Sequence, residues 1–301
     1  MAEHRVLTDA MKPPATGLEA AWGRTLGPRR ALRKNPTMAG GFVILIVIAF
    51  TAICSAQITT KSATRLSPQE RLGAPSRDNW FGTDQLGRDV YARTIYGSRI
   101  SLLVGVLVSC ASMVGGAFFG CVAGYSRTLD SIIMRFADGL MAFPSLLLAI
   151  ALMAVLAPGL TNVIVAITVV QIPTITRVVR SAVLSLRERE FVDAARAIGA
   201  SPVRIVFRHV LPNTVAILLV YGTLTFALAI LSEASLSFLG AGIPLETPSW
   251  GNGMGQGRDY ARQAFWVIFY PGLFLSITIL GINLIGDGLR DALDPRISRR
   301  A

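Results

Sequence analysis

The order of apolar and polar residues predicts a membrane protein with six helical spans. A helix that crosses a bilayer needs about 20 mostly apolar residues, and several stretches between charged residues meet that length. The charge-free stretch 139–176 is too long for one helix, and Ala157-Pro158-Gly159 divides it because Pro and Gly interrupt helices. The predicted spans are 38–58, 100–126, about 132–156, about 160–180, 209–240 and about 265–286.

Basic residues predict which side of the membrane each connection occupies. Six spans place both termini on one side, and Lys and Arg favour cytoplasmic loops. With cytoplasmic termini, 20 of the 29 Lys and Arg residues lie inside and nine outside. A cleaved signal peptide is the less favoured interpretation of the first span, because 37 residues precede it. The expected organisation is a cytoplasmic tail at 1–37, the first span at 38–58, an extracytoplasmic loop at 59–98, a core of five spans at 97–287 and a cytoplasmic tail at 288–301.

Composition narrows the class of protein further. Only 16% of the 301 residues are charged, against about 25% in soluble domains, and this excludes a soluble fold. The net charge of +11 alone is typical of nucleic-acid binding, but the charges are too sparse and the apolar runs too long, so no nucleic-acid partner is expected. The three Cys and two His residues lack the spacing of a metal site, so neither a metal nor a cofactor is expected on this chain.

Two acidic residues fall within or beside predicted spans, where a carboxylate is costly and a functional candidate. Asp138 lies three residues after Arg135 and is expected to form a local ion pair with it. Glu233 has no charged neighbour in sequence, and it either lines a pathway through the bundle or accepts hydrogen bonds between helices. Small residues recur every four positions in the second span and predict close helix packing: Ser112, Gly116, Gly120 and Gly124.

The connection between the fourth and fifth spans has the pattern of two short helices. An apolar face recurs there at helical spacing, through Phe191, Ala194, Ala195 and Ile198. Gly199 is expected to end the first helix at its C′ position. Ser201 and Pro202 are expected to cap and begin the second. Such a hairpin either docks in a groove of another protein or lies on the lipid surface.

The same connection resembles a family signature. Asp193-Ala194-Ala195, then Gly199, then His209-Val210-Leu211-Pro212 resembles the E-A-A…G…I-x-L-P signature of bacterial ATP-binding-cassette (ABC) importer permeases. Asp193 replaces the usual Glu and keeps the carboxylate, while His209 replaces Ile, as is common in the peptide and nickel branch of the family. Four further segments resemble that branch in order and spacing: 81–90, with its G-T-D-x-x-G-R-D pattern, 232–240, 247–251 and 283–295. The chain is thus similar to the C-type permease of dipeptide, oligopeptide and nickel importers, with some likeness to glutathione permeases.

The resemblance implies an all-α, six-span type I ABC importer permease of the bacterial inner membrane. It implies a heterodimer with a homologous permease, two ATPase subunits that bind ATP and Mg²⁺, an extracytoplasmic substrate-binding protein and contact with membrane lipid. It also implies a coupling helix at about 188–200 that docks on an ATPase subunit. The residues expected to carry this docking are Asp193, Ala194, Ala195, Gly199, Leu211 and Pro212.

The outer loop supplies the remaining candidates. Asp84, Arg88 and Asp89, together with Glu233, are candidates for a pathway or gate, and an internal salt-bridged cap is the alternative for the loop residues. The sequence has no G-x-x-x-x-G-K-[S/T] phosphate loop, so the chain is not expected to be an enzyme and ATP hydrolysis is expected on partner subunits. The cargo stays open between peptides, nickel, glutathione and opine-like compounds, and a stand-alone secondary transporter is the alternative function.

Overall fold

The helices of the chain are described by a computed structural model that covers residues 35–293. The predicted N-terminal tail, apart from its last residues, and the end of the C-terminal tail lie outside the described residues. In chain order the elements are α4 (Pro36–Ile53), α5 (Ser55–Ile58), η1 (Pro68–Glu70), α6 (Val90–Tyr125), α7 (Arg127–Met141), α8 (Ser145–Leu156), α9 (Leu160–Leu186), α10 (Glu190–Ala197), α11 (Pro202–Ile205), the π-helical η2 (Val206–Val210), α12 (Leu211–Phe238), α13 (Trp250–Gly257), η3 (Arg258–Tyr260) and α14 (Trp266–Leu293).

Among the described residues, five helical segments are long and apolar enough to cross a membrane: α4, α6, α9, α11 through α12, and α14. The third predicted span, about 132–156, is not one continuous helix, although the bent pair that replaces it counts as a sixth span if both halves cross together. It is divided into α7 and α8, whose axes meet at 93°. The break lies at Pro144, which has an extended backbone with ψ of 128°. Proline disfavours a helical conformation in the residue before it and has no N–H to continue a helix.

The second span begins earlier than the apolar run indicates. α6 starts at Val90 and is 36 residues long, whereas the charge pattern predicts a start near residue 100. Asp89 caps its N-terminus, because its carboxylate accepts a hydrogen bond from the backbone N–H of Ala92 at 2.7 Å. The first turns of α6 are polar yet buried, because loops at this end of the bundle cover them. Polar residues therefore continue the helix beyond its apolar run.

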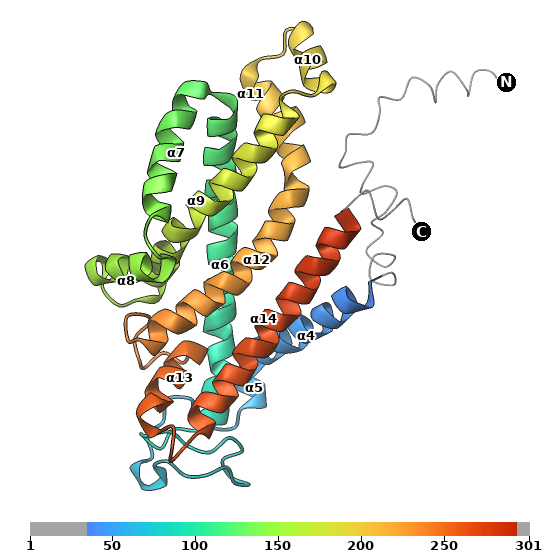
Figure 1. The fold of residues 1–301 in the computed structure, drawn as a ribbon. Coiled ribbons are helices and arrows are strands. Elements are labelled where there is room, and N and C mark those ends of the chain that lie inside the picture. The colour runs from blue at the N-terminus through green and yellow to red at the C-terminus, as the bar shows by residue number, and fades with distance from the viewer. Residues whose placement is uncertain (1–34, 294–301) are drawn as a thin grey trace, which may run out of the picture.

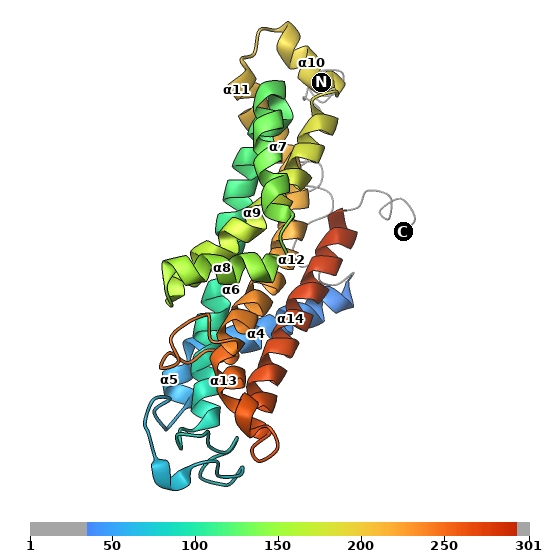
Figure 2. The same ribbon diagram turned by 60° about the vertical axis from the view of Figure 1, so that its left-hand side comes forward.

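The helices form an elongated bundle with a different structure at each end (Figure 1). α4 packs beside α14, and α12 contacts α6, α9 and α14. α10 and α11 lie at one end of the bundle, and the loop 59–89 lies with α13 at the other, as both views show (Figure 2). The two segments that the sequence marks as candidate sites are thus separated by the length of α6.

α6 packs closely against α9, and glycine makes the contact possible. Three glycines of α6 each face a β-branched residue of α9: Gly116 faces Ile175, Gly120 faces Val179 and Gly124 faces Val183. A Cβ atom at Gly120 would lie 2.6 Å from the Cβ of Val179, which is closer than real atoms approach. The predicted packing role of the small residues is confirmed for these three glycines.

We expect Gly120→Ala to lower the melting temperature of the purified protein in detergent. The added methyl group would also lie 2.8 Å from the backbone oxygen of Thr176, which has no freedom to move aside. Overpacking of this kind costs about 1–3 kcal/mol. Gly139→Ala in α7 is the matched control, because a Cβ there meets nothing within 4 Å. Equal melting temperatures for the two variants would contradict the packing argument.

Candidate functional site

The first candidate site is the turn between α10 and α11, at one end of the bundle (Figure 1). Gly199 has φ of +79°, a left-handed conformation that favours glycine. Its N–H donates to the carbonyl of Arg196 at 2.9 Å, and the N–H of Ala200 donates to the carbonyl of Ala195 at 3.0 Å. This is the hydrogen-bond pattern of a Schellman cap. A Cβ at Gly199 would meet nothing within 4 Å, so the backbone conformation and not the space calls for glycine.

The second short helix starts as its sequence predicts. The Ser201 hydroxyl accepts a hydrogen bond from the N–H of Arg204 at 3.4 Å, and Pro202 occupies the first turn. The chain then passes through the π-helical turn η2 into α12 at Leu211. Pro212 has no N–H to donate within a regular helix, and the π turn before it accommodates this gap.

The apolar residues of α10 divide between two faces. Val192 and Ala195 are buried, and they pack in the same core cluster as Ile205 and Val210. Ile198 is 85% exposed, and Phe191 and Ala194 are exposed on the same side. The predicted single face is therefore wrong for Ala195. Val192 and Ala195 form the stripe that holds α10 to the bundle, and the other residues of this helix are exposed.

The expected docking residues occupy two places. Asp193, Ala194 and Gly199 are exposed around α10, and Asp193 forms an ion pair with Arg196 at 3.1 Å. Leu211 and Pro212 are half-buried at the start of α12, where they connect the short helices to a long one. The structure thus brings three of the six residues to one exposed surface, while Ala195 faces inward and the last two lie at its base.

The second candidate site is a buried polar network at the opposite end of the bundle. Asp84 accepts the backbone N–H groups of Leu86 at 2.8 Å and Arg88 at 2.9 Å through one oxygen. Its other oxygen accepts from the guanidinium Nε of Arg88 at 2.7 Å, and the Nε of Arg93 lies 3.8 Å away. The Asp84 and Arg88 side chains are 3% and 6% exposed. Of the two sequence interpretations, this geometry is that of a salt-bridged cap.

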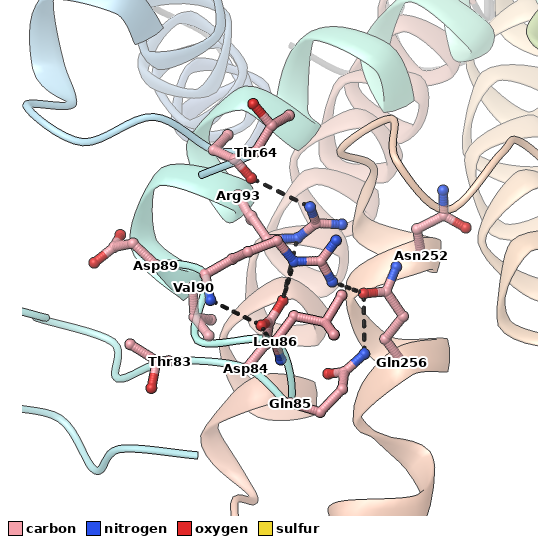
Figure 3. Close-up of polar contacts among 12 residues, drawn as sticks. Thr64, Thr83, Asp84, Gln85, Leu86, Asp89, Val90, Arg93, Asn252 and Gln256 are labelled. Atoms are coloured by element: carbon pink, nitrogen blue, oxygen red, sulfur yellow. Dashed lines mark hydrogen bonds and ion pairs between the residues drawn. The ribbon is translucent and has the colours of Figure 1, made fainter. Parts of the chain in front are cut away.

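Two residues that sequence reasoning did not select complete the network. Gln256 of α13 accepts hydrogen bonds from Arg88 and, at 3.2 Å, from Gln85. Arg93 donates to the carbonyls of Ala63 and Leu245 at 3.2 and 3.3 Å and so joins two loops to α6. Figure 3 shows Asp84, Arg93 and Gln256 from three segments of the chain pointing toward one another. No local pattern indicates Gln256, because it is 168 residues from Arg88 in sequence.

Asp89 does not join this ion pair. Its carboxylate caps α6, and burial raises its pKa although the Ala92 N–H and Lys61 act in the opposite direction. In this conformation the contact of Asp89 is therefore structural, because it caps the start of the helix that carries Arg93. A role at a gate stays a prediction.

Glu233 is fully buried where α12, α6 and α13 meet. Its carboxylate accepts hydrogen bonds from the Ser101 hydroxyl at 3.2 Å and the Ser237 hydroxyl at 2.9 Å. The Ser101 oxygen in turn accepts from the backbone N–H of Trp250 at 3.4 Å. Of the two alternatives left open by the sequence, the geometry is that of hydrogen bonding between helices. A role in the pathway stays a prediction.

Asp138 has a different partner from the one expected. It pairs with Arg177 of α9 at 2.6 Å and not with Arg135, so that expectation is wrong. A second ion pair, between Asp130 and Arg180, also joins α7 to α9. Both acidic residues therefore serve to hold α7 against the long helix beside it.

We expect Asp84→Ala to destabilise the loop 59–89 strongly. Removing one partner of a buried ion pair leaves an uncompensated charge, here Arg88, at a cost of about 3–5 kcal/mol. The measurements are the melting temperature and the rate of protease cleavage within 59–89. Asp78→Ala is the control, because Asp78 is exposed in the same loop. Unchanged cleavage in the Asp84 variant would contradict a stabilising role of this buried ion pair.

Comparison with known proteins gives a family model and relatives over most of the chain. The model of the binding-protein-dependent transport system inner membrane component matches residues 115–299. A dipeptide transport system permease protein of Alkalihalophilus pseudofirmus is 43% identical, over 89% of this chain and 88% of that protein. A dipeptide transport system permease protein of Bacillus subtilis is 39% identical, over 99% and 91%. An oligopeptide transport system permease protein of the same species is 41% identical, over 89% and 88%.

A solved structure has a similar fold. The inward-facing MetNI methionine ABC transporter contains a chain that matches with a TM-score of 0.56 and 22% sequence identity. The match covers 67% of this chain and 96% of that chain. At this identity the likeness concerns the fold alone.

Proposed function

Because this chain belongs to the family of inner-membrane components of binding-protein-dependent transport systems, we propose that it forms part of the membrane pathway of an ATP-driven importer for dipeptides and oligopeptides. The chain is a multi-pass helical protein of the bacterial inner membrane with the type I ABC importer permease fold. The observation that carries the cargo class is the set of relatives, 39–43% identical over nearly their whole length, that are named for dipeptides and oligopeptides.

The proposed transporter needs four kinds of subunit. This chain pairs with a homologous permease, two ATPase subunits supply ATP hydrolysis with Mg²⁺, and an extracytoplasmic protein delivers the cargo. The family places the ATPase on separate subunits, and the sequence has no phosphate-binding loop of its own. The chain itself is a permease subunit and binds no cofactor in this proposal.

The proposed orientation places the α10–α11 end in the cytoplasm and the loop 59–89 with α13 outside. Two observations support it. The two terminal tails carry eleven of the 29 Lys and Arg residues, and six spans place both tails on the same side as the α10–α11 connection. The opposite end has a compact cap of buried polar contacts, where an extracytoplasmic protein finds a rigid surface.

Coupling is proposed to run through α10. Its exposed side, with Ala194 and Ile198, is available to an ATPase subunit, and small Ala side chains permit close approach. Its other side is held to the bundle by Val192 and Ala195, so that movement of α10 is transmitted to the base of α12 at Leu211. Two discrete packings of the long helices then give alternating access, and ATP binding selects between them.

The outer residues have an indirect role in this proposal. Asp84, Arg88 and Glu233 are buried and paired in this conformation, which supports a role in holding the outer loops together. Such a cap acts on a gate by keeping α13 and the loop 239–249 in place against α6. Contact of these side chains with cargo requires another conformation.

The proposed function predicts peptide uptake that requires every subunit. The chain, its homologous permease, both ATPases and the binding protein are reconstituted in vesicles with a labelled dipeptide and a labelled pentapeptide. Uptake is expected only with ATP and the binding protein present. Vesicles with the chain alone are the control. Transport by the chain alone favours a secondary transporter, and uptake of nickel or glutathione in place of peptide overturns the cargo class.

We expect Gly199→Val to uncouple ATP hydrolysis from uptake. A β-branched residue at φ of +79° is strained, by about 1–2 kcal/mol even for an ordinary side chain, and the turn reshapes to relieve it. Gly199→Asn is the matched control, because Asn tolerates this conformation. The expected result is at least a tenfold loss of uptake for Val with assembly retained, and near-normal uptake for Asn. Normal uptake by the Val variant would exclude the turn from coupling.

A further inference from the structure

The end of α6 that carries Tyr125 borders two hollows of opposite character. One is an apolar groove of about 520 Å³ between the last turns of α6 and the segment formed by α11 and η2. Phe118 and Cys121 line it from α6, and Val203 and Phe207 line it from the other side. Val203 is 66% exposed and Phe207 64%, so these apolar side chains are open to whatever fills the groove.

The second hollow is basic and also has a volume of about 520 Å³. Three arginines line it, with two acidic residues: Arg127, Arg187, Arg196, Glu188 and Asp193. Two of the arginines already have a polar contact, since Arg196 pairs with Asp193 at 3.1 Å and Arg187 donates to the carbonyl of Gly124 at 3.2 Å. Within residues 35–293 the Arg127 guanidinium has no ion pair or hydrogen bond.

Tyr125 lines both hollows, so they adjoin at one side chain. The apolar run of α6 ends at this residue, and Arg127 follows two positions later. Tyrosine is typical of the boundary between hydrocarbon and headgroups. The groove therefore extends toward the apolar side of that boundary, and the arginines lie on the polar side.

We infer that the two hollows form one binding site for an anionic diacyl phospholipid. The phosphate lies against Arg127 and Arg187, and an acyl chain lies in the groove along Phe118, Cys121 and Phe207. Charge complementarity selects the headgroup, because basic pockets beside membrane helices bind anionic lipids. Each hollow has a size typical of small-molecule sites, about 300–1,000 Å³. Only the choice of leaflet rests on the proposed function, because the orientation proposed there places this end of α6 at the cytoplasmic leaflet.

A lipid in this site has a mechanical consequence. It contacts α6 through Phe118 and the α11–η2 segment through Phe207, so it fills the space between a long helix and the base of the proposed coupling element. The exposed side of α10, with Ile198, stays free for an ATPase subunit. Asp193 is common to the docking residues and the basic hollow, whereas Ala194 and Ile198 line neither hollow.

The test measures lipid retained by the full-length protein, purified together with the subunits that accompany it. The protein is exchanged from detergent into mixed micelles with equal amounts of phosphatidylglycerol and phosphatidylcholine, both with palmitoyl and oleoyl chains. Tightly held lipid is then counted by native mass spectrometry. Phosphatidylglycerol is expected in preference to phosphatidylcholine. Equal retention of the two would overturn the assignment of the arginines.

Arg127→Gln tests the headgroup. Retained phosphatidylglycerol is expected to fall about fivefold, the factor that corresponds to about 1 kcal/mol per basic residue near an anionic surface. Arg189→Gln is the matched control, because Arg189 is exposed beside the hollow without lining it. An equal fall in both variants reflects general charge and would overturn the site.

Phe207→Ser tests the groove. Loss of the apolar contact is expected to lower retention at least tenfold, because burying a large apolar side chain contributes about 1.5–3 kcal/mol. Phe136→Ser is the control, since Phe136 is 74% exposed on α7 and lies away from the groove. Full retention in the Phe207 variant would overturn the proposal, as would a groove covered by the homologous permease in the assembled transporter. The readout needs no transport, so failure of the lipid site and failure of the proposed function are distinguishable.

Discussion

The close contact between α6 and α9 is the constraint on which the rest of the bundle depends. In lipid, apolar side chains gain little by leaving one apolar surrounding for another, so helices associate through close packing and polar contacts. Gly120 and its neighbours one turn away permit that packing by leaving room for the branched side chains of α9. α6 also contacts α4, α7, α12, α13 and α14. A change in the separation of α6 and α9 would therefore move the surfaces on which the other helices pack.

The two ends of the bundle differ in how firmly they are held. At the end with the loop 59–89, Asp84, Arg88 and Glu233 are buried with hydrogen-bonded partners, and paired buried polar groups rigidify the elements that they join. At the other end α10 is held by a narrow stripe, Val192 and Ala195, and most of its surface is exposed. The proposed coupling suits this arrangement, because the helix proposed to move is small and the opposite cap resists deformation.

Local patterns predicted most of the helices and the turn at Gly199. The apolar run, the cap and the glycine conformation each depend on residues within a few positions of one another. Such local patterns are visible in a single sequence. The errors have the same origin. Pro144 carries a local signal for the break between α7 and α8, but the apolar residues on both sides of it favoured one span. The arginine just before Asp138 in sequence is Arg135, but Asp138 pairs with Arg177, because α9 packs against α7 and brings that side chain close.

The sequence by itself determined the number and length of the apolar segments, the caps of the short helices and the family of the chain. These follow from short-range sterics and from the minimum length of a membrane helix. Only the tertiary structure decided which charges pair and which faces stay open. Gln256 reaches Arg88 across 168 positions, and Ala195 turns inward while Ile198 turns outward. The reason is physical: a buried charge pairs with the groups that helix packing places beside it, and that packing depends on contacts between residues far apart in the chain.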